Sequence, residues 1–208
     1  GYQNLPRLHK PLPIPINVEK IAYQENQLRN GKLVVFHGLI REGFKGTHHV
    51  RAAFDILRQK YPNDVECIIQ GGLPLHEYMN LLSTVNVVVD QTSSHGSGVN
   101  GLFSLALGKV VLGGNEPVHQ QLMYGDDPCP IRNILPEPES IVAQVEAILA
   151  QRDQLPALGL AGRARWVVGV LAAVLVVLAL PGLAPHVVAP PPPATAGSVQ
   201  AGERWQPW

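Results

Sequence analysis

Short apolar segments alternate with amphipathic helical segments through the middle of the chain. Leu33–Phe36 and Val87–Val89 contain no polar residue. Strands that are apolar throughout must be covered on both faces, and this is typical of a parallel sheet between two layers of helices. The segment between these strands has the matching pattern, since Val50, Ala53 and Leu57 recur at helical spacing. The chain is therefore predicted to fold as an α/β protein.

The alternation continues over most of the chain. The predicted strands are Leu33–His37, Val65–Gln70, Asn86–Asp90, Lys109–Gly113 and Pro130–Leu135. The predicted helices are Thr47–Tyr61, Leu75–Thr84, Val99–Leu107 and Glu139–Arg152. Together they predict a Rossmann-like parallel sheet with helices on both faces.

Composition divides the chain of 208 residues into parts. Residues 1–31 are predicted to be a linker or crossover, because four prolines between Leu5 and Asn17 exclude a helix there. Residues 32–162 contain the alternating pattern and form the predicted Rossmann-like domain. The chain begins with Gly1 instead of Met and has no signal sequence. We therefore expect it to be the later part of a longer protein, with another domain before Gly1.

Residues 163–208 form a divergent tail that is apolar and then proline-rich. Arg163 and Arg165 precede the apolar run Trp166–Leu180, and a segment of 166–184 approaches the roughly 20 residues that a bilayer span needs. One interpretation is a membrane anchor with its basic end inside the cell. The other is that the tail is foreign to the domain, through a reading-frame change or a fusion. The sequence leaves both open.

The charge balance and the cysteines exclude several classes of function. Lys plus Arg and Asp plus Glu number 16 each, so no overall field favours nucleic acid as a partner. Cys67 and Cys129 lie far apart without a paired motif, which predicts two reduced thiols and neither zinc nor a disulfide. The remaining candidate ligands, His48, His49, His76 and His119, lack the spacing of a metal site. No metal and no cofactor are expected.

The stretch from His37 to Gly46 is the strongest candidate site. It runs from a strand through a glycine-containing turn into a helix, an arrangement that directs backbone N–H groups and the positive end of a helix dipole at one point. Arg41 and Lys45 add two positive charges there. We predict a phosphate cradle for a diphosphate, with an ordinary solvated turn as the alternative.

Further glycines follow the other predicted strands. They are Gly71 and Gly72, Gly96 and Gly98, and Gly113 and Gly114. Ligands of open parallel sheets bind beyond the carboxyl ends of the strands, so these glycines are predicted to line one rim together with Gly38. A tight turn without ligand contact is the alternative for Gly71 and Gly72.

With these segments, residues from about Pro13 to Gly162 resemble the C-terminal, donor-binding domain of a GT-B fold glycosyltransferase of the group 1 (retaining) type. Gly38–Gly46 is similar to the family's glycine, arginine and lysine-glycine segment, which binds the donor diphosphate. Ile68–Gly72 with the following Glu77 and Tyr78 resembles the strand, glycine turn and short helix beside the nucleotide base. His95–Val111 has the layout of the family's E-x7-E segment.

The chain departs from the family at both acidic positions of the E-x7-E segment. His95 and Phe103 stand where the glutamates are expected, and the second of these usually holds the ribose hydroxyls of the nucleotide. A phenyl ring cannot accept a hydrogen bond from a hydroxyl group as a carboxylate does. Either Asn100, Ser104 or Glu77 supplies that contact, or the donor site is weakened.

The resemblance implies a glycosyltransferase of hexosyltransferase type, acting in carbohydrate biosynthesis, that transfers a sugar from a nucleotide-sugar to an acceptor hydroxyl. It implies that Arg41 and Lys45 act catalytically on the leaving diphosphate. It further implies that the donor is bound by Gly38, Gly46, Gly71, Gly72, Glu77, His95, Gly96, Gly98, Asn100 and Phe103.

The expected partners are the nucleotide-sugar donor and an acceptor glycan or lipid, the latter held by the missing N-terminal domain. The isolated fragment is therefore expected to be inactive. A cytoplasmic location is expected, with membrane association if residues 166–184 are an anchor. Two alternatives remain, namely a sugar-nucleotide epimerase of the same architecture and a non-catalytic nucleotide-binding or interaction module.

Overall fold

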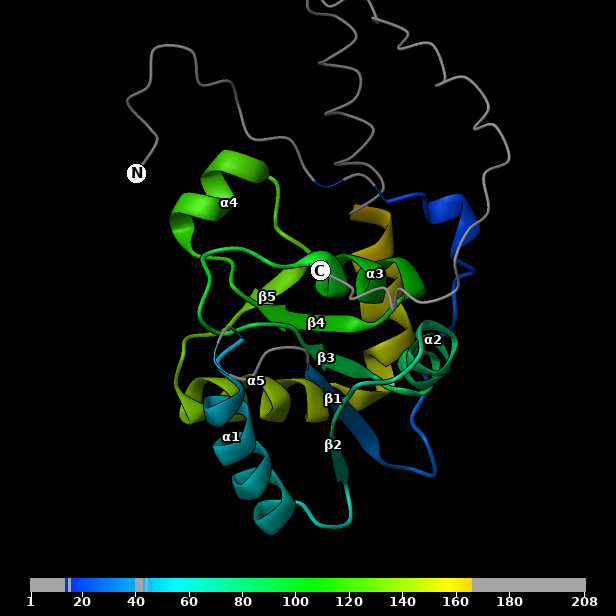
Figure 1. Ribbon diagram of the computed structural model, residues 1–208, viewed down its shortest axis with the longest axis vertical. Coiled ribbons are helices and arrows are strands. Elements are labelled where there is room, and N and C mark those ends of the chain that lie inside the picture. The colour runs from blue at the N-terminus through cyan, green and yellow to red at the C-terminus, as the bar shows by residue number, and fades with distance from the viewer. Residues whose placement is uncertain (1–13, 15, 40–42, 44, 166–208) are drawn as a thin grey trace, which may run out of the picture.

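The computed structural model describes residues 14, 16–39, 43 and 45–165 (Figure 1). Within them lies a parallel sheet of order β2-β1-β3-β4-β5. Its strands are β1 (Leu33–Leu39), β2 (Val65–Gly71), β3 (Val87–Val89), β4 (Val110–Gly113) and β5 (Ile131–Asn133). The helices are α1 (Thr47–Lys60), α2 (Leu75–Thr84), α3 (Val99–Leu107), α4 (Pro117–Met123) and α5 (Pro138–Leu149), with short 3-10 helices at Val18–Lys20 and Arg152–Gln154. The predicted Rossmann-like α/β fold is confirmed.

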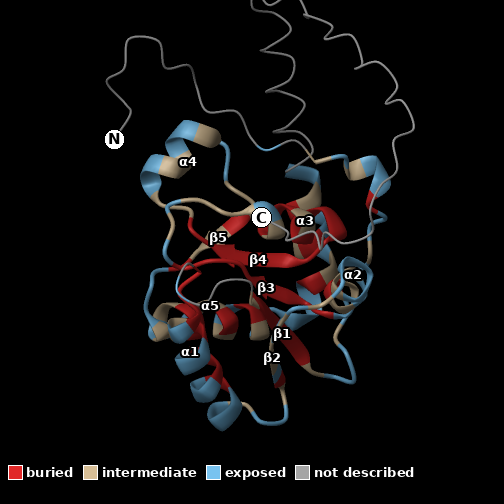
Figure 2. Ribbon diagram, viewed as in Figure 1, coloured by how far each residue is buried: buried red, intermediate tan, exposed pale blue. Residues whose placement is uncertain are grey.

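Apolar residues alternate between the two faces of the sheet. In β1, Leu33 and Val35 pack in the cluster that α1 and α5 cover, whereas Val34 and Phe36 pack in the cluster beneath α2 and α3. All four side chains are fully buried, and Figure 2 shows the central strands buried between the helical layers. The wholly apolar composition of this strand follows from its burial on both faces.

The direction of the connections changes in the middle of the sheet. β1 leads into α1 on one face, while its neighbour β3 leads into α3 on the opposite face. Open parallel sheets bind ligands at such a switch point, just beyond the carboxyl ends of the strands. The segment after β1 and the segment after β3 are therefore the two that meet at the candidate site.

Two elements differ from the expectation. Helix α4 was not predicted, and its apolar residues Val118 and Leu122 are exposed, so it lacks the buried stripe by which helices are recognised. Residues 155–165 are helical, and this helix was not predicted either. Arg163 donates to the carbonyl oxygen of Ile21 at 3.0 Å, which ties this helix to the segment before β1.

The predicted apolar segment 166–184 and residues 1–13 of the predicted linker lie outside the described residues. Among the residues described, no helix has the length and apolar character needed to span a bilayer.

Candidate functional site

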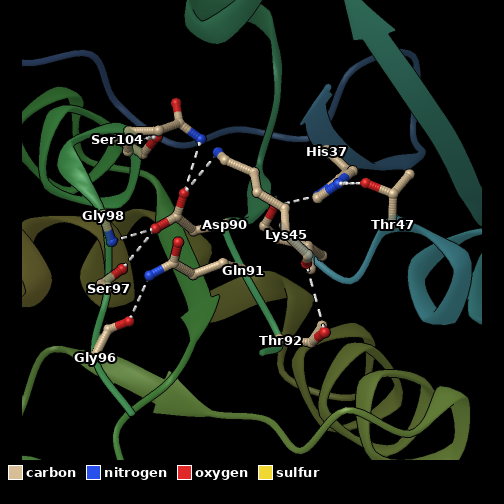
Figure 3. A network of polar contacts seen from close by, with 12 residues as sticks. His37, Lys45, Thr47, Asp90, Gln91, Thr92, Gly96, Ser97, Gly98 and Ser104 are labelled. Carbon is tan, nitrogen blue, oxygen red and sulfur yellow. Dashed lines mark hydrogen bonds and ion pairs between the residues drawn. The ribbon is translucent and has the colours of Figure 1, made fainter. Parts of the chain in front are cut away.

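An ion pair joins the two segments that meet at the switch point. Lys45, just before α1, donates from Nζ to Oδ1 of Asp90 at 3.1 Å (Figure 3). Asp90 directly follows β3 and its side chain is fully buried, while the Lys45 side chain is 11% exposed. The predicted cradle lysine therefore lies at the carboxyl rim of the sheet, but its charge is compensated by a carboxylate 45 positions away in the sequence.

Asp90 also organises the loop that leads into α3. Its Oδ2 accepts from the Ser97 hydroxyl at 3.0 Å and from the Gly98 N–H at 2.6 Å, and its Oδ1 accepts from Asn100 Nδ2 at 3.4 Å. A Cβ at Gly98 would lie 3.2 Å from Oδ2, so the glycine allows the backbone to approach the carboxylate closely. Predicted residues Gly98 and Asn100 are thus brought together with Lys45.

His37 supports the same junction from within the sheet. It is fully buried in β1, with Nδ1 2.8 Å from the carbonyl oxygen of Val89 and Nε2 3.0 Å from Oγ1 of Thr47. Since a carbonyl oxygen only accepts, Nδ1 carries the proton and Nε2 accepts from the threonine. Burial lowers the pKa of His37, which keeps the ring neutral and lets it link β3 to the first residue of α1.

Gly46 is required by its conformation and its surroundings. Its φ of +67° lies in the left-handed region, and a Cβ there would lie 2.0 Å from Oγ1 of Thr92. The neighbouring Lys45 carbonyl accepts from the Thr92 N–H at 3.2 Å. The segment before α1 is therefore fixed against the segment after β3 through its backbone as well as through the ion pair.

His95 lies in a second polar cluster, beside the start of α4. Its Nδ1 donates to Oε2 of Glu116 at 2.6 Å, and both side chains are exposed to solvent. Gly96 accepts at its carbonyl from Gln91 Nε2 at 2.7 Å, and a Cβ at Gly96 would lie 2.7 Å from the ring of His119. His95 and Gly96 thus lie against residues in and just before α4. Within the described residues, neither of them contacts Lys45 directly.

Phe103, at the second E-x7-E position, has an apolar environment. Phe103 packs in the apolar cluster beneath α2 and α3 together with Tyr78. The Tyr78 hydroxyl donates to Oδ1 of Asn100 and lies close to Gly38, where a Cβ would be 2.9 Å from it. Burial raises the pKa of Tyr78, so this hydroxyl keeps its proton. Gly38 therefore allows Tyr78 to reach Asn100.

Two suggested substitutes for the missing glutamate differ in access. Ser104 is fully buried and its hydroxyl donates to the carbonyl of Asn100 at 2.8 Å, so it has no open side toward a ligand. Glu77 is exposed in the first turn of α2, 3.7 Å from His76. Asn100 is the one of the three suggested residues that contacts Asp90.

Gly71 ends β2, the edge strand of the sheet, and Gly72 follows it. A Cβ at Gly71 would lie 2.0 Å from the Leu39 carbonyl oxygen, so the close pairing of β1 and β2 explains this glycine. Gly72 has a φ of +70°, in the left-handed region, and its turn explains this glycine. Both positions are accounted for without a ligand.

Arg41, the second cradle cation, lies outside the described residues. Among the residues that the structure describes, no group of three potential metal ligands is present, and Cys67 and Cys129 are free thiols. Sequence reasoning noted Asp90 only as the end of a strand and missed its contact with Lys45. The signal available was a carboxylate directly after a wholly apolar strand, where an unpaired charge would be costly.

The chain matches no protein-family model and no curated protein sequence. It is similar to solved structures, among them the C-terminal domain of LpcC, a glycosyl transferase group 1 family protein from Francisella tularensis, with a TM-score of 0.55 and 15% identity over 72% of this chain and 95% of that one. The described residues have the fold of a group 1 glycosyltransferase C-terminal domain.

Two further solved structures that match are larger than the chain. Sucrose-phosphate synthase from Thermosynechococcus elongatus matches with a TM-score of 0.54 and 18% identity, over 79% of this chain and 49% of that one. TarM matches with a TM-score of 0.51 and 13% identity, over 76% of this chain and 36% of that one. The chain thus spans half or less of the length of these two proteins.

Proposed function

We propose that the chain is the donor-binding part of a glycosyltransferase, which holds a nucleotide-sugar while its sugar passes to an acceptor hydroxyl. The observation that supports this most directly is the position of Lys45, which lies with Asp90 at the switch point of a glycosyltransferase-type fold. Ligands of open parallel sheets bind at this place.

In this proposal the donor diphosphate lies between the segment before α1 and the start of α3. Lys45 would donate to the phosphate oxygens, and the first-turn N–H groups of α3 would face the same negative charge. As the bond to the sugar breaks, charge develops on the leaving diphosphate, and both groups stabilise it. Arg41 is proposed to share this role, and no metal is needed for it.

A non-catalytic nucleotide-binding module is the second candidate. The observation that favours it is the packing of Phe103 in the apolar cluster with Tyr78, at a position where the resemblance leads one to expect a ribose-binding carboxylate. Both candidates predict binding of the donor. They differ in whether a protein that contains this domain transfers the sugar, which a glycosyl-transfer assay decides.

Calorimetric titration of the chain with UDP-, GDP- and ADP-linked sugars tests the donor site. We expect one of the three to bind, and Lys45→Gln to weaken its binding about 10- to 100-fold, because a charge-assisted hydrogen bond contributes about 1.5–3 kcal/mol. Glutamine removes the positive charge and, although its side chain is one atom shorter, still carries an N–H donor.

Lys32→Ala is the matched control. Lys32 carries the same charge but precedes β1, at the amino end of the strands and away from the carboxyl rim, where it donates to the carbonyl of Pro62. Its substitution should leave donor affinity within about twofold. Equal affinity of the wild-type chain and Lys45→Gln would rule out the cradle.

A further inference from the structure

Asp90 is a buried carboxylate with no acceptor site left for a ligand. Its oxygens accept from Lys45, Asn100, Ser97 and Gly98. A carboxylate offers about four lone-pair sites, and these donors occupy them. Since its side chain is also fully buried, Asp90 does not itself bind a substrate group. Any effect that it has on a ligand must pass through its neighbours or through its charge.

The contacts of Asp90 differ in kind. Three of its donors, the Ser97 hydroxyl, the Gly98 N–H and the Asn100 amide, are neutral and hold the carboxylate in place by themselves. The fourth is the ammonium of Lys45, the only member of the ion pair with an exposed fraction. An anion therefore approaches this pair from the Lys45 side. The positive charge of Lys45 is already balanced by the buried Asp90 carboxylate.

We propose that Asp90 competes with the donor diphosphate for Lys45. This competition lowers the affinity of the site for the diphosphate and so favours release of the nucleoside diphosphate after transfer. This rests on the proposed function. The Asp90 carboxylate and a phosphate bound to Lys45 are like charges about 6 Å apart, and these repel appreciably even at the effective dielectric constant of a protein site. Asp90 is thus a positioning residue that fixes Lys45 and sets how tightly Lys45 grips an anion.

Asp90→Asn tests the proposal, because it removes the charge and preserves the size of the side chain. The probe is whichever of UDP, GDP and ADP the wild-type chain binds most tightly in calorimetry. We expect Asp90→Asn to bind it at least about 10-fold more tightly, or about 1.4 kcal/mol. Without nucleotide the variant should melt at a lower temperature than the wild type, since Lys45 has lost its counter-charge.

The expected variant binds nucleotide more tightly but is less stable without it. A residue with a merely structural role would not give this result, because loss of structure lowers both affinity and stability. Asp55→Asn is the control: it removes the same charge from an exposed ion pair on α1 and should leave affinity within about twofold. Asp90→Ser is the second variant, since its hydroxyl is neutral and still offers a hydrogen-bond acceptor. If both Asp90 variants are unfolded without ligand, refolding on addition of the nucleotide supports the proposal and failure to refold overturns it.

Unchanged or weaker binding by folded Asp90→Asn overturns the proposal and leaves the donor site standing. If the wild-type chain binds none of the three nucleotides, the proposed function fails and this inference fails with it.

Discussion

At the scale of single residues, the site depends on groups that fix one another. Lys45 and Gly46 from the segment after β1 contact Asp90 and Thr92 from the segment after β3. His37, within β1, contacts Val89 and Thr47 beside them. The sequence predicted Lys45 and Gly46 because they lie in one short stretch. It did not predict their partners, since contacts between residues about 45 positions apart depend on the order of the strands.

Gly46→Ala should destabilise the chain more than Gly72→Ala. Both glycines have a left-handed backbone, which costs an alanine about 1–2 kcal/mol. At Gly46 the new methyl group would also lie 2.0 Å from Oγ1 of Thr92, whereas at Gly72 no atom of the described residues lies within 4 Å. We expect a loss of about 3 kcal/mol or more for Gly46→Ala and about 1 kcal/mol for Gly72→Ala, measured by urea unfolding. Equal losses would contradict the close packing of Gly46 on Thr92.

At the scale of secondary-structure elements, Lys109 connects the start of β4 to the end of α2. It is 2% exposed, and its Nζ donates to the carbonyl of Ser83 at 2.8 Å, in the last turn of the helix. A cation suits the negative end of a helix dipole. Burial nevertheless lowers the pKa of Lys109 to about 8, so the folded chain gives up this proton more readily than the unfolded chain.

This difference predicts a pH effect on stability. Between about pH 8 and pH 10.5 the unfolded chain binds more protons at Lys109, so this residue makes the free energy of unfolding rise with pH, by at most about 1.4 kcal/mol per unit. Cys67 acts in the opposite direction, because burial raises its pKa to about 12. We therefore compare the wild type with Lys109→Met between pH 7.5 and pH 9.5, where the contribution of Cys67 is common to both.

The wild-type chain should gain stability relative to Lys109→Met as the pH rises through this range. A parallel pH dependence of the two proteins would show that Lys109 is not buried as described.

The elements themselves could largely be predicted from the sequence. β1, β3, α1 and α5 have strong apolar patterns, and their positions agree with the expectation within a few residues. α4 was missed because it spans only Pro117–Met123 and none of its residues is buried. Sequence patterns indicate a helix or strand through the periodic apolar residues of its buried face. An element with few buried residues therefore has only a weak pattern.

At the scale of the whole molecule, the strand order turns separate motifs into one site. The order β2-β1-β3-β4-β5 places β1 beside β3, and this brings Lys45 to Asp90 and to the start of α3. The sequence predicted that glycine-rich junctions share one rim, but not which of them are neighbours. As a result, Gly98 and Asn100 meet Lys45 through Asp90, whereas the contacts of His95 lead to Glu116 near α4.

The central claim is that Lys45 and the start of α3 hold the diphosphate of a donor. A crystal structure of the chain with a bound nucleoside diphosphate tests it most directly. We expect phosphate oxygens about 3 Å from Lys45 Nζ and facing the first turn of α3, with Asp90 still hydrogen-bonded to the Gly98 N–H. A nucleotide bound elsewhere, or with its phosphates turned away from Lys45, would contradict it.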